Sequence, residues 1–178
     1  MGINRLTTEP DITPAVAAKL LDDLTAIVAQ ASAVVLSNPA DAVARRTKAD
    51  QSPVSAADEA SEAVILEGCA RAAANVPVVS EERISRSAPP LLRHSFILAD
   101  PLDGTREFLQ GRDEFTVNLA IVSGGIPIAG IVAAPALGLL WRGVVGTSAE
   151  RFRMARDGAL SGSETIRTRR WPGQDAIA

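Results

Sequence analysis

The sequence predicts an α+β fold in which two helices pack on a mainly antiparallel sheet. Two segments in the first half carry apolar residues at the three- and four-residue spacing of a helix. The second half instead carries a succession of apolar, β-branched segments separated by short turns that contain glycine. Because the helices precede the strands rather than alternate with them, an α+β order is favoured over a run of βαβ units.

The first helix is predicted to begin at Thr13-Pro14, where a capping residue precedes a proline at the first helical position. Apolar residues then recur along one face, and the helix is predicted to end near Ser37-Asn38-Pro39. Residues 1–12 are expected to form a loose N-terminal segment, which leaves residues 13–178 as one domain. A domain of this size can bury a hydrophobic core.

The second helix is predicted to begin just after Ser55. Ser55 and Asp58 have the spacing of a capping box, so on local chemistry alone both are interpreted as helix caps. The segment before this helix is polar and irregular. The predicted apolar face of the helix consists of Ala60, Val64, Ile65, Cys69 and Ala72.

A short strand is predicted from Val76 to Glu82, and it ends in two adjacent acids. Neighbouring side chains on a strand point to opposite faces, so only one of Glu81 and Glu82 could reach a shared site. Without further information the two acids would be interpreted as solvated surface residues. The segment from Ile84 to Arg93 has turn-forming residues and no periodicity, which predicts a surface loop.

The stretch from Phe96 to Phe108 is the most informative part of the sequence. Its apolar start predicts a buried strand, and Asp100 and Asp103 follow before an Asp-Gly turn. Two carboxylates held at the end of a strand suit Mg²⁺, which binds few protein carboxylates and leaves positions open for phosphate. The alternative is a solvated turn after a strand, because Asp-Pro and Asp-Gly are ordinary turn dipeptides.

The rest of the chain predicts an antiparallel meander, since the strands follow one another with short connections. Gly124-Gly125 is the clearest turn. The strands are expected at residues 115–122, 126–134, 139–145, 151–154 and 165–168.

Composition excludes several classes of function. The net charge of −3 and the 3% of aromatic residues give no support for binding a nucleic-acid polymer. A single cysteine and a single histidine exclude an intrachain disulfide and a zinc site with several cysteines, and they disfavour a histidine-rich metal site. No signal peptide is expected, and the longest apolar candidate for a membrane span, Ile126 to Leu140, is interrupted by prolines and glycines.

The run from Asp100 to Thr105, Asp-Pro-Leu-Asp-Gly-Thr, resembles the D-P-[IL]-D-G-T signature of the inositol monophosphatase superfamily. Members of that superfamily are metal-dependent, lithium-sensitive phosphatases. The extension Arg106-Glu107-Phe108, followed by residues 114–118, resembles the CysQ-type branch, the 3'(2'),5'-bisphosphate nucleotidases. Residues 48–58 and 76–82 also resemble family motifs, with Ser55 where the family usually has threonine. The resemblance implies the N-terminal lobe of the inositol-monophosphatase-like fold.

The resemblance also implies a reaction and a site. The expected reaction is removal of the 3'-phosphate of adenosine 3',5'-bisphosphate, a by-product of sulfate assimilation, by water activated between two or more Mg²⁺ ions. The implied metal ligands are Glu81, Asp100, the Leu102 carbonyl and Asp103. Asp58 and Thr105 would orient the attacking water, and Glu82 would support them. The residues expected to hold the phosphate are Leu102, Asp103, Gly104 and Thr105.

Alternatives stay open at this point. Activity on inositol phosphates or fructose bisphosphate would use the same motifs. The family also has a C-terminal lobe with a W-D-x-A motif, and this sequence contains no Trp-Asp pair. A further hypothesis is therefore that the chain is a truncated, non-catalytic lobe that binds metal. The expected location is the cytoplasm, and peripheral contact with the inner membrane and a homodimer are left open.

Overall fold

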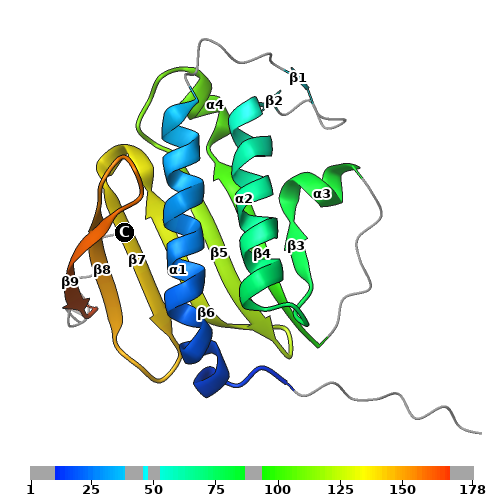
Figure 1. The fold of residues 1–178 in the computed structure, drawn as a ribbon, viewed down its shortest axis with the longest axis vertical. Helices are drawn as coiled ribbons and strands as arrows, with labels where there is room; N and C mark the ends of the chain where they lie inside the picture. The colour runs from blue at the N-terminus through cyan, green and yellow to red at the C-terminus, as the bar shows by residue number, and fades with distance from the viewer. Residues whose placement is uncertain (1–10, 39–45, 48–52, 87–93, 169–178) are drawn as a thin grey trace, which may run out of the picture.

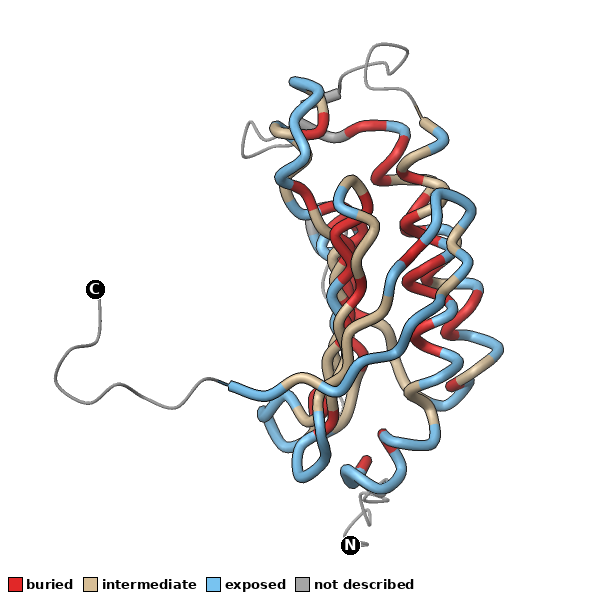
Figure 2. Tube along the Cα trace, turned by 90° about the vertical axis from the view of Figure 1, so that its left-hand side faces the viewer, coloured by how far each residue is buried: buried red, intermediate tan, exposed pale blue. Residues whose placement is uncertain are grey.

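Two long helices lie side by side on one face of a seven-stranded sheet in the computed structural model (Figure 1), which describes residues 11–38, 46–47, 53–86 and 94–168. Figure 2 shows the two layers nearly edge-on, with the helices on one side of the sheet. The predicted α+β class, with two helices on a mainly antiparallel sheet, is thereby confirmed.

Helix α1, Pro14–Ser37, begins and ends where the sequence predicts. Thr13 caps it, and the Thr13 hydroxyl accepts a hydrogen bond from the Val16 N–H. Ile12 was assigned to the loose N-terminal segment, but it is buried and its N–H donates to Ser95 Oγ at 3.0 Å. That contact ties the start of α1 to the sheet, while residues 1–10 lie outside the described part of the chain.

Helix α2, Ala56–Ala72, carries the predicted capping box at Ser55. It packs closely against α1, because a Cβ added to Gly68 would lie 2.6 Å from Ile27 Cγ1. Its buried face differs from the prediction. Ile65 and Cys69 are buried as expected, but the other predicted apolar positions are only half-buried. The remaining buried residues of the helix are Ala57, Asp58, Ser61, Glu62 and Gly68.

The large sheet is mixed, with one parallel pair at one edge. Strand β3, Val78–Ser80, runs parallel to β4, Ser95–Asp103, and every later pairing is antiparallel. The later strands are β5 (Thr116–Ser123), β6 (Ile126–Ala134), β7 (Leu139–Val144), β8 (Ala149–Met154) and β9 (Leu160–Ile166). The predicted meander is confirmed, but β9 begins five residues earlier than the predicted start at residue 165.

Shorter elements complete the described fold. Strands β1 (Arg46–Thr47) and β2 (Pro53–Val54) pair with each other, α4 spans Thr105–Leu109, and the 3-10 helix η2 spans Pro135–Leu137. The motif residues Lys48 and Asp50 lie outside the described residues.

The structure corrects the prediction around the two adjacent acids. The predicted strand stops at Ser80, and Glu81 begins helix α3, Glu81–Arg86. Acidic side chains are favourable in the first turn of a helix, where the helix dipole is positive. The predicted surface loop therefore begins as helix, and residues 87–93 are not described.

The far edge of the described sheet is formed by β9. Most of its side chains are exposed, and Gly162 has φ +63°. The pairing of β8 with β9 also slips between Arg151 and Arg153. This strand is accordingly polar and irregular, unlike the apolar strands in the middle of the sheet.

Arginine 142 lies on the helix-facing side of β7 and links the sheet to α1. Its side chain donates to Asp22 Oδ1 at 2.6 Å and to Glu150 Oε2 at 2.8 Å, and it lies over the Phe152 ring. Only 14% of the Arg142 side chain is exposed, so the two carboxylates neutralise a largely buried charge.

Helix α1 also meets the length and hydropathy criterion for a membrane span, with a mean hydropathy of 1.5. This differs from the expectation that Ile126 to Leu140 is the longest apolar candidate for a membrane span. Within the described part of the chain, 44% of that apolar window is buried inside the fold, where α1 lies across β6 and β7 (Figure 1). A core helix of a folded domain satisfies the same criterion, so the finding is weak support for a membrane span.

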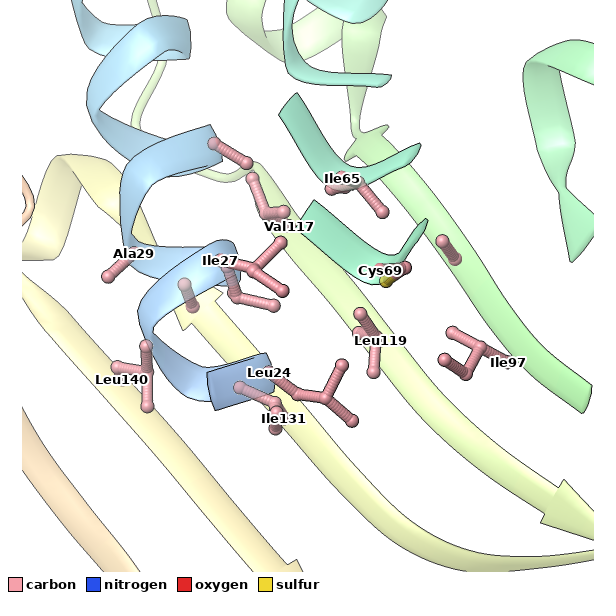
Figure 3. Close-up of a cluster of buried hydrophobic side chains, with 14 of the residues drawn as sticks. Leu24, Ile27, Ala29, Ile65, Cys69, Ile97, Val117, Leu119, Ile131 and Leu140 are labelled. Atoms are coloured by element: carbon pink, nitrogen blue, oxygen red, sulfur yellow. The ribbon is translucent and has the colours of Figure 1, made fainter. Parts of the chain in front are cut away.

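The core between the helices and the sheet contains the single cysteine of the chain. Figure 3 shows Cys69 on α2 among Ile65, Ile97 and Leu119. The thiol is fully buried, and burial raises its pKa to about 11. A protonated, inaccessible thiol reacts slowly, because the thiolate is the nucleophile.

We expect Cys69 of the native chain to resist alkylation and to react quickly in denaturant. The measurement is the rate of iodoacetamide labelling followed by mass spectrometry. A Ser148→Cys variant, with a second thiol at an exposed turn position, supplies the reference rate for an accessible thiol. Equal labelling of the two thiols in the native chain would contradict the burial of Cys69.

Candidate active site

The candidate site lies where β3 ends and its pairing with β4 stops. Their parallel register pairs Ser80 with Ala99, which places the next residues, Glu81 and Asp100, beside each other. Their carboxyl groups are close enough to form a hydrogen bond when one of them is protonated. Two acids that are 19 positions apart in the sequence are thus brought into direct contact by one strand pairing.

Asp100 lies in an unfavourable environment for a negative charge. Burial raises its pKa, and the neighbouring charges of Glu81 and Asp103 raise it further, to about 7. Crowded carboxylates raise one another's pKa unless a cation neutralises them. Asp100 therefore has the electrostatic character expected of a cation ligand.

A bulge in β4 separates the two aspartates of the motif. Asp100 pairs with Asn118 and Asp103 pairs with Thr116, so β4 carries one more residue than β5 over this interval. Such bulges redirect side chains and are common beside active sites. The Leu102 N–H donates to Asp100 Oδ1 at 3.2 Å, and Asn118 Nδ2 donates to Asp103 Oδ2 at 3.3 Å.

Gly104 makes the sharp reversal that the sequence predicts. Its φ is +91°, in the left-handed region, and a Cβ there would lie 2.7 Å from the carbonyl oxygen of Glu114. Helix α4 then starts at Thr105, and its first intrahelical bond runs from Phe108 N–H to Gly104 O. The backbone N–H groups before Phe108 precede this bond, as at every helix start.

Asp58 and Thr105 come together although they lie 47 positions apart in the sequence. The Thr105 hydroxyl is 3.0 Å from Asp58 Oδ1 and 3.1 Å from the Leu102 carbonyl oxygen. The Ser55 N–H donates to Asp58 Oδ2 at 2.8 Å, and the Ser55 hydroxyl donates to the same oxygen. The capping box thus fixes the carboxylate that contacts Thr105.

Asp58 is only 1% exposed. Burial raises its pKa, and the hydrogen bonds from Ser55 and Thr105 oppose that shift. These bonds satisfy both carboxylate oxygens, so Asp58 can act as a fixed acceptor for the Thr105 hydroxyl. The two predicted catalytic residues are adjacent in the structure, and their catalytic roles stay predictions.

The two adjacent acids have different surroundings. Glu81 is exposed at the start of α3, whereas Glu82 is 2% exposed. The expectation that only one of them reaches a shared site depended on strand geometry, and the structure has a helix there instead. A supporting role for Glu82 stays a prediction.

A cleft of about 670 Å³ adjoins the motif. Its acidic lining residues are Asp103, Glu107, Asp113 and Glu114, and Gly104, Phe115 and Thr116 also contribute. These carboxylates repel an anionic phosphate, and because three of the four are exposed, water screens part of that repulsion. Cations bound beside Asp103 would favour the binding of a phosphorylated compound there.

The carboxylate and carbonyl oxygens at the site are suitable ligands for Mg²⁺, but they do not form a complete metal-binding group. Over the described ranges, no three side chains of His, Cys, Asp or Glu form a group that could hold a metal ion. The adjacent donors are the carboxylates of Glu81 and Asp100, with Asp103 close enough to shift the pKa of Asp100. Oxygen donors of this kind are those that Mg²⁺ prefers, so Glu81, Asp100, Asp103 and the Leu102 carbonyl stay the predicted ligands.

Two residues near the site were missed by the sequence reasoning. Ser61 donates to the carbonyl oxygen of Pro101 at 2.7 Å, and Ser80 donates to Glu62 Oε1. Ser61 and Glu62 are both buried on α2. The sequence could have indicated them only as polar residues at positions where the helical spacing predicts burial.

The family model for the inositol monophosphatase family matches residues 15–175 of this chain. The chain belongs to this family. The match confirms the resemblance carried by the D-P-L-D-G-T motif, and it covers both the helices and the sheet.

Curated members of the family are similar over about half of the chain. The 3'(2'),5'-bisphosphate nucleotidase CysQ of Shigella flexneri is 43% identical over 105 residues, which are 56% of this chain and 41% of that protein. CysQ of Salmonella typhimurium is 45% identical over 96 residues, which are 53% of this chain and 38% of that protein. In each comparison the match spans less than half the length of the relative.

Solved structures of family members have the same fold. CysQ of Bacteroides thetaiotaomicron is 28% identical with a TM-score of 0.54, and the match covers 75% of this chain and 49% of that one. An inositol monophosphatase of Thermotoga maritima has a TM-score of 0.68 at 21% identity, covering 84% and 54% of the two chains. The second likeness shows the shared fold alone.

Proposed function

We propose that this member of the inositol monophosphatase family is a metal-dependent phosphatase that removes the 3'-phosphate of adenosine 3',5'-bisphosphate. The observation that carries the proposal is the contact of Thr105 with the fixed carboxylate of Asp58, next to the acidic pair Glu81 and Asp100. The similarity to nucleotidases named CysQ supports the choice of substrate.

The chain's own residues supply orientation and charge. With its hydroxyl proton donated to Asp58, Thr105 Oγ keeps lone pairs that can accept a hydrogen bond from a water molecule and hold it for attack. The backbone N–H groups at the start of α4 would donate to the phosphate oxygens. Glu81, Asp100, Asp103 and the Leu102 carbonyl would hold Mg²⁺, which when bound neutralises phosphate charge and lowers the pKa of water.

Phosphoryl transfer needs alignment and charge neutralisation more than covalent participation of the protein. The proposal accordingly includes no covalent intermediate. It places the reaction in the cytoplasm, with a small phosphorylated nucleotide and not a nucleic-acid polymer as the partner. The net charge of −3 supports that choice of partner.

A second candidate is a lobe that binds metal without turnover by itself. It is favoured by the sequence, which contains no Trp-Asp pair of the kind found in the family's W-D-x-A motif. Hydrolysis of inositol phosphates or fructose bisphosphate is the enzymatic alternative, because the D-P-L-D-G-T motif is shared across the family.

The test is phosphate release by the purified chain from adenosine 3',5'-bisphosphate, with and without Mg²⁺, beside inositol 1-phosphate and fructose bisphosphate. The expected result is Mg²⁺-dependent release that prefers the nucleotide and is abolished by Asp103→Asn without loss of the circular dichroism spectrum. Preference for inositol 1-phosphate would contradict the substrate. No release from a folded chain that binds Mg²⁺ would contradict the activity and favour the metal-binding lobe.

A further inference from the structure

Three side chains on one face of α2 each bond to a different segment of the candidate site. Asp58 contacts Thr105 on α4, Ser61 donates to the Pro101 carbonyl in β4, and Glu62 accepts from Ser80 in β3. Positions three and four apart lie on the same face of a helix, so one rigid face holds all three contacts. Asp58 belongs to the proposed mechanism, whereas Ser61 and Glu62 have no role in it.

The contact made by Ser61 fixes the bulge between the two motif aspartates. Pro101 lies directly after Asp100, is almost fully buried, and falls where the pairing of β4 with β5 is interrupted. A buried carbonyl needs a hydrogen-bond partner, and Ser61 supplies one at 2.7 Å. Since Ser61 is itself 0% exposed, water cannot easily take its place.

The contact made by Glu62 fixes the end of β3. Ser80 is the last residue of that strand, and the next residue is Glu81. The Ser80 side chain is 0% exposed and the Glu62 side chain is 8% exposed, so the bond between them is protected from solvent. The hydrogen bond therefore anchors the backbone from which Glu81 emerges.

We propose that Ser61 and Glu62 are positioning residues that hold Asp100 and Glu81 in register for a shared cation, an inference that rests on the proposed function. Their contacts act on Pro101 and Ser80, which are covalent neighbours of the two acids. Without those contacts the end of β3 can shift relative to the bulge in β4. The affinity for the cation then falls, because ligands must be held before binding to avoid an entropic cost.

The experiment measures Mn²⁺ binding to the purified chain by electron paramagnetic resonance, because this readout does not depend on turnover. Ser61→Ala removes the hydrogen bond to the Pro101 carbonyl. Glu62→Leu and Ser80→Ala each remove the hydrogen bond between Glu62 and Ser80, the first by changing the acceptor and the second by changing the donor. The matched control is Glu67→Gln, which changes an exposed acid on the same helix. Thermal unfolding without metal shows whether each variant is folded.

We expect Ser61→Ala and Glu62→Leu to weaken Mn²⁺ binding about 10-fold or more, as is typical when groups that orient metal ligands are changed. Ser80→Ala should reproduce the effect of Glu62→Leu, and Glu67→Gln should bind as the wild type does. Glu62→Gln should restore most of the affinity, because its amide oxygen can still accept from Ser80. A general loss of stability would not be rescued in this selective way.

The outcomes separate this inference from the proposed function. Wild-type affinity in folded Ser61→Ala and Ser80→Ala variants would overturn the positioning roles alone. A wild-type chain that binds no Mn²⁺ would contradict both proposals. Weakened Mn²⁺ binding in the variants, combined with no phosphate release by the wild type, would support the positioning roles and contradict the activity.

Discussion

Replacement of Asp100 by asparagine is expected to abolish the stabilisation of the chain by Mg²⁺ and to raise its unfolding temperature when metal is absent. Asparagine has nearly the same shape and keeps an oxygen that can accept from the Leu102 N–H. It removes a charge that burial, Glu81 and Asp103 make unfavourable. A general disruption of the fold would lower the unfolding temperature both with and without Mg²⁺, so it cannot produce this combination of effects.

The pKa of Asp100 sets the pH range of the effect. Because the pKa is raised from 3.8 to about 7 in the folded chain, the folded state binds the proton more tightly than the unfolded state. Stability without metal therefore falls as the pH rises from the lower value to the higher one, and the penalty is complete above pH 7. After allowance for solvent screening, a gain of about 1 kcal/mol for the variant corresponds to about 2–4 °C.

Melting curves measured above and below the Asp100 pKa, with and without Mg²⁺, check this expectation. Asp23→Asn, a change to an exposed aspartate on α1, should alter neither the metal-free curve nor the response to Mg²⁺. If Asp100→Asn kept the full response to Mg²⁺, Asp100 would not be a metal ligand. If the Asp100→Asn variant had a lower unfolding temperature than the wild type without metal, the inference that negative charge at Asp100 destabilises the metal-free chain would be wrong.

Gly104→Ala is expected to cost the chain about 2–4 kcal/mol of unfolding free energy, the largest effect of a single methyl group that we foresee. Gly104 has φ +91°, and the added Cβ would lie 2.7 Å from the Glu114 carbonyl oxygen and 3.2 Å from Phe115 Cα. Both neighbours are backbone atoms, so they cannot move aside by a change of rotamer. The turn must shift, and it carries Asp103 and Thr105 with it.

Gly111→Ala is the matched control, because Gly111 also has a positive φ, +71°, but a Cβ there would meet nothing within 4 Å. It should cost only the conformational penalty, about 1–2 kcal/mol. The difference between the two variants in urea-unfolding experiments isolates the steric contribution. Equal losses would mean that the backbone around Gly104 accommodates the methyl group without cost.

Much of the fold could be predicted because its signals are local. Thr13-Pro14 and Ser55 start helices by capping, and Gly124-Gly125 makes a turn, all within a few residues. The strands that follow one another in sequence are neighbours in the sheet. Strand β9 was predicted too short because its sequence is polar and gives no alternation of apolar residues.

What could not be predicted depends on contacts between distant parts of the chain. Ser61 and Glu62 look like surface positions of a helix, and only their partners in β4 and β3 make burial acceptable. Arg142 faces inward for the same reason, since Asp22 lies 120 positions away. At Glu81 the preference of acids for a helix start prevailed over the strand pattern.

In the candidate site, too, local features could be predicted and contacts between distant residues could not. Asp100, Gly104 and Thr105 could be placed from one continuous motif, and in the structure they follow one another from the end part of β4 to the start of α4. The contact between Asp58 and Thr105 could be expected only from the family resemblance, because no spacing rule connects residues so far apart in sequence. The contact between Glu81 and Asp100 follows from the register of a parallel pair, which the sequence does not encode locally.

The irregular β9 has a consequence for how the domain behaves in solution. A straight, apolar edge strand offers its free backbone groups as a template on which strands of other molecules can add. In the part of the chain that the structure describes, β9 presents Gly162, serine hydroxyls and Glu164 next to a slipped pairing with β8. Such an edge is a poor template, so this side of the sheet resists the addition of a strand from another molecule and the aggregation that follows from it.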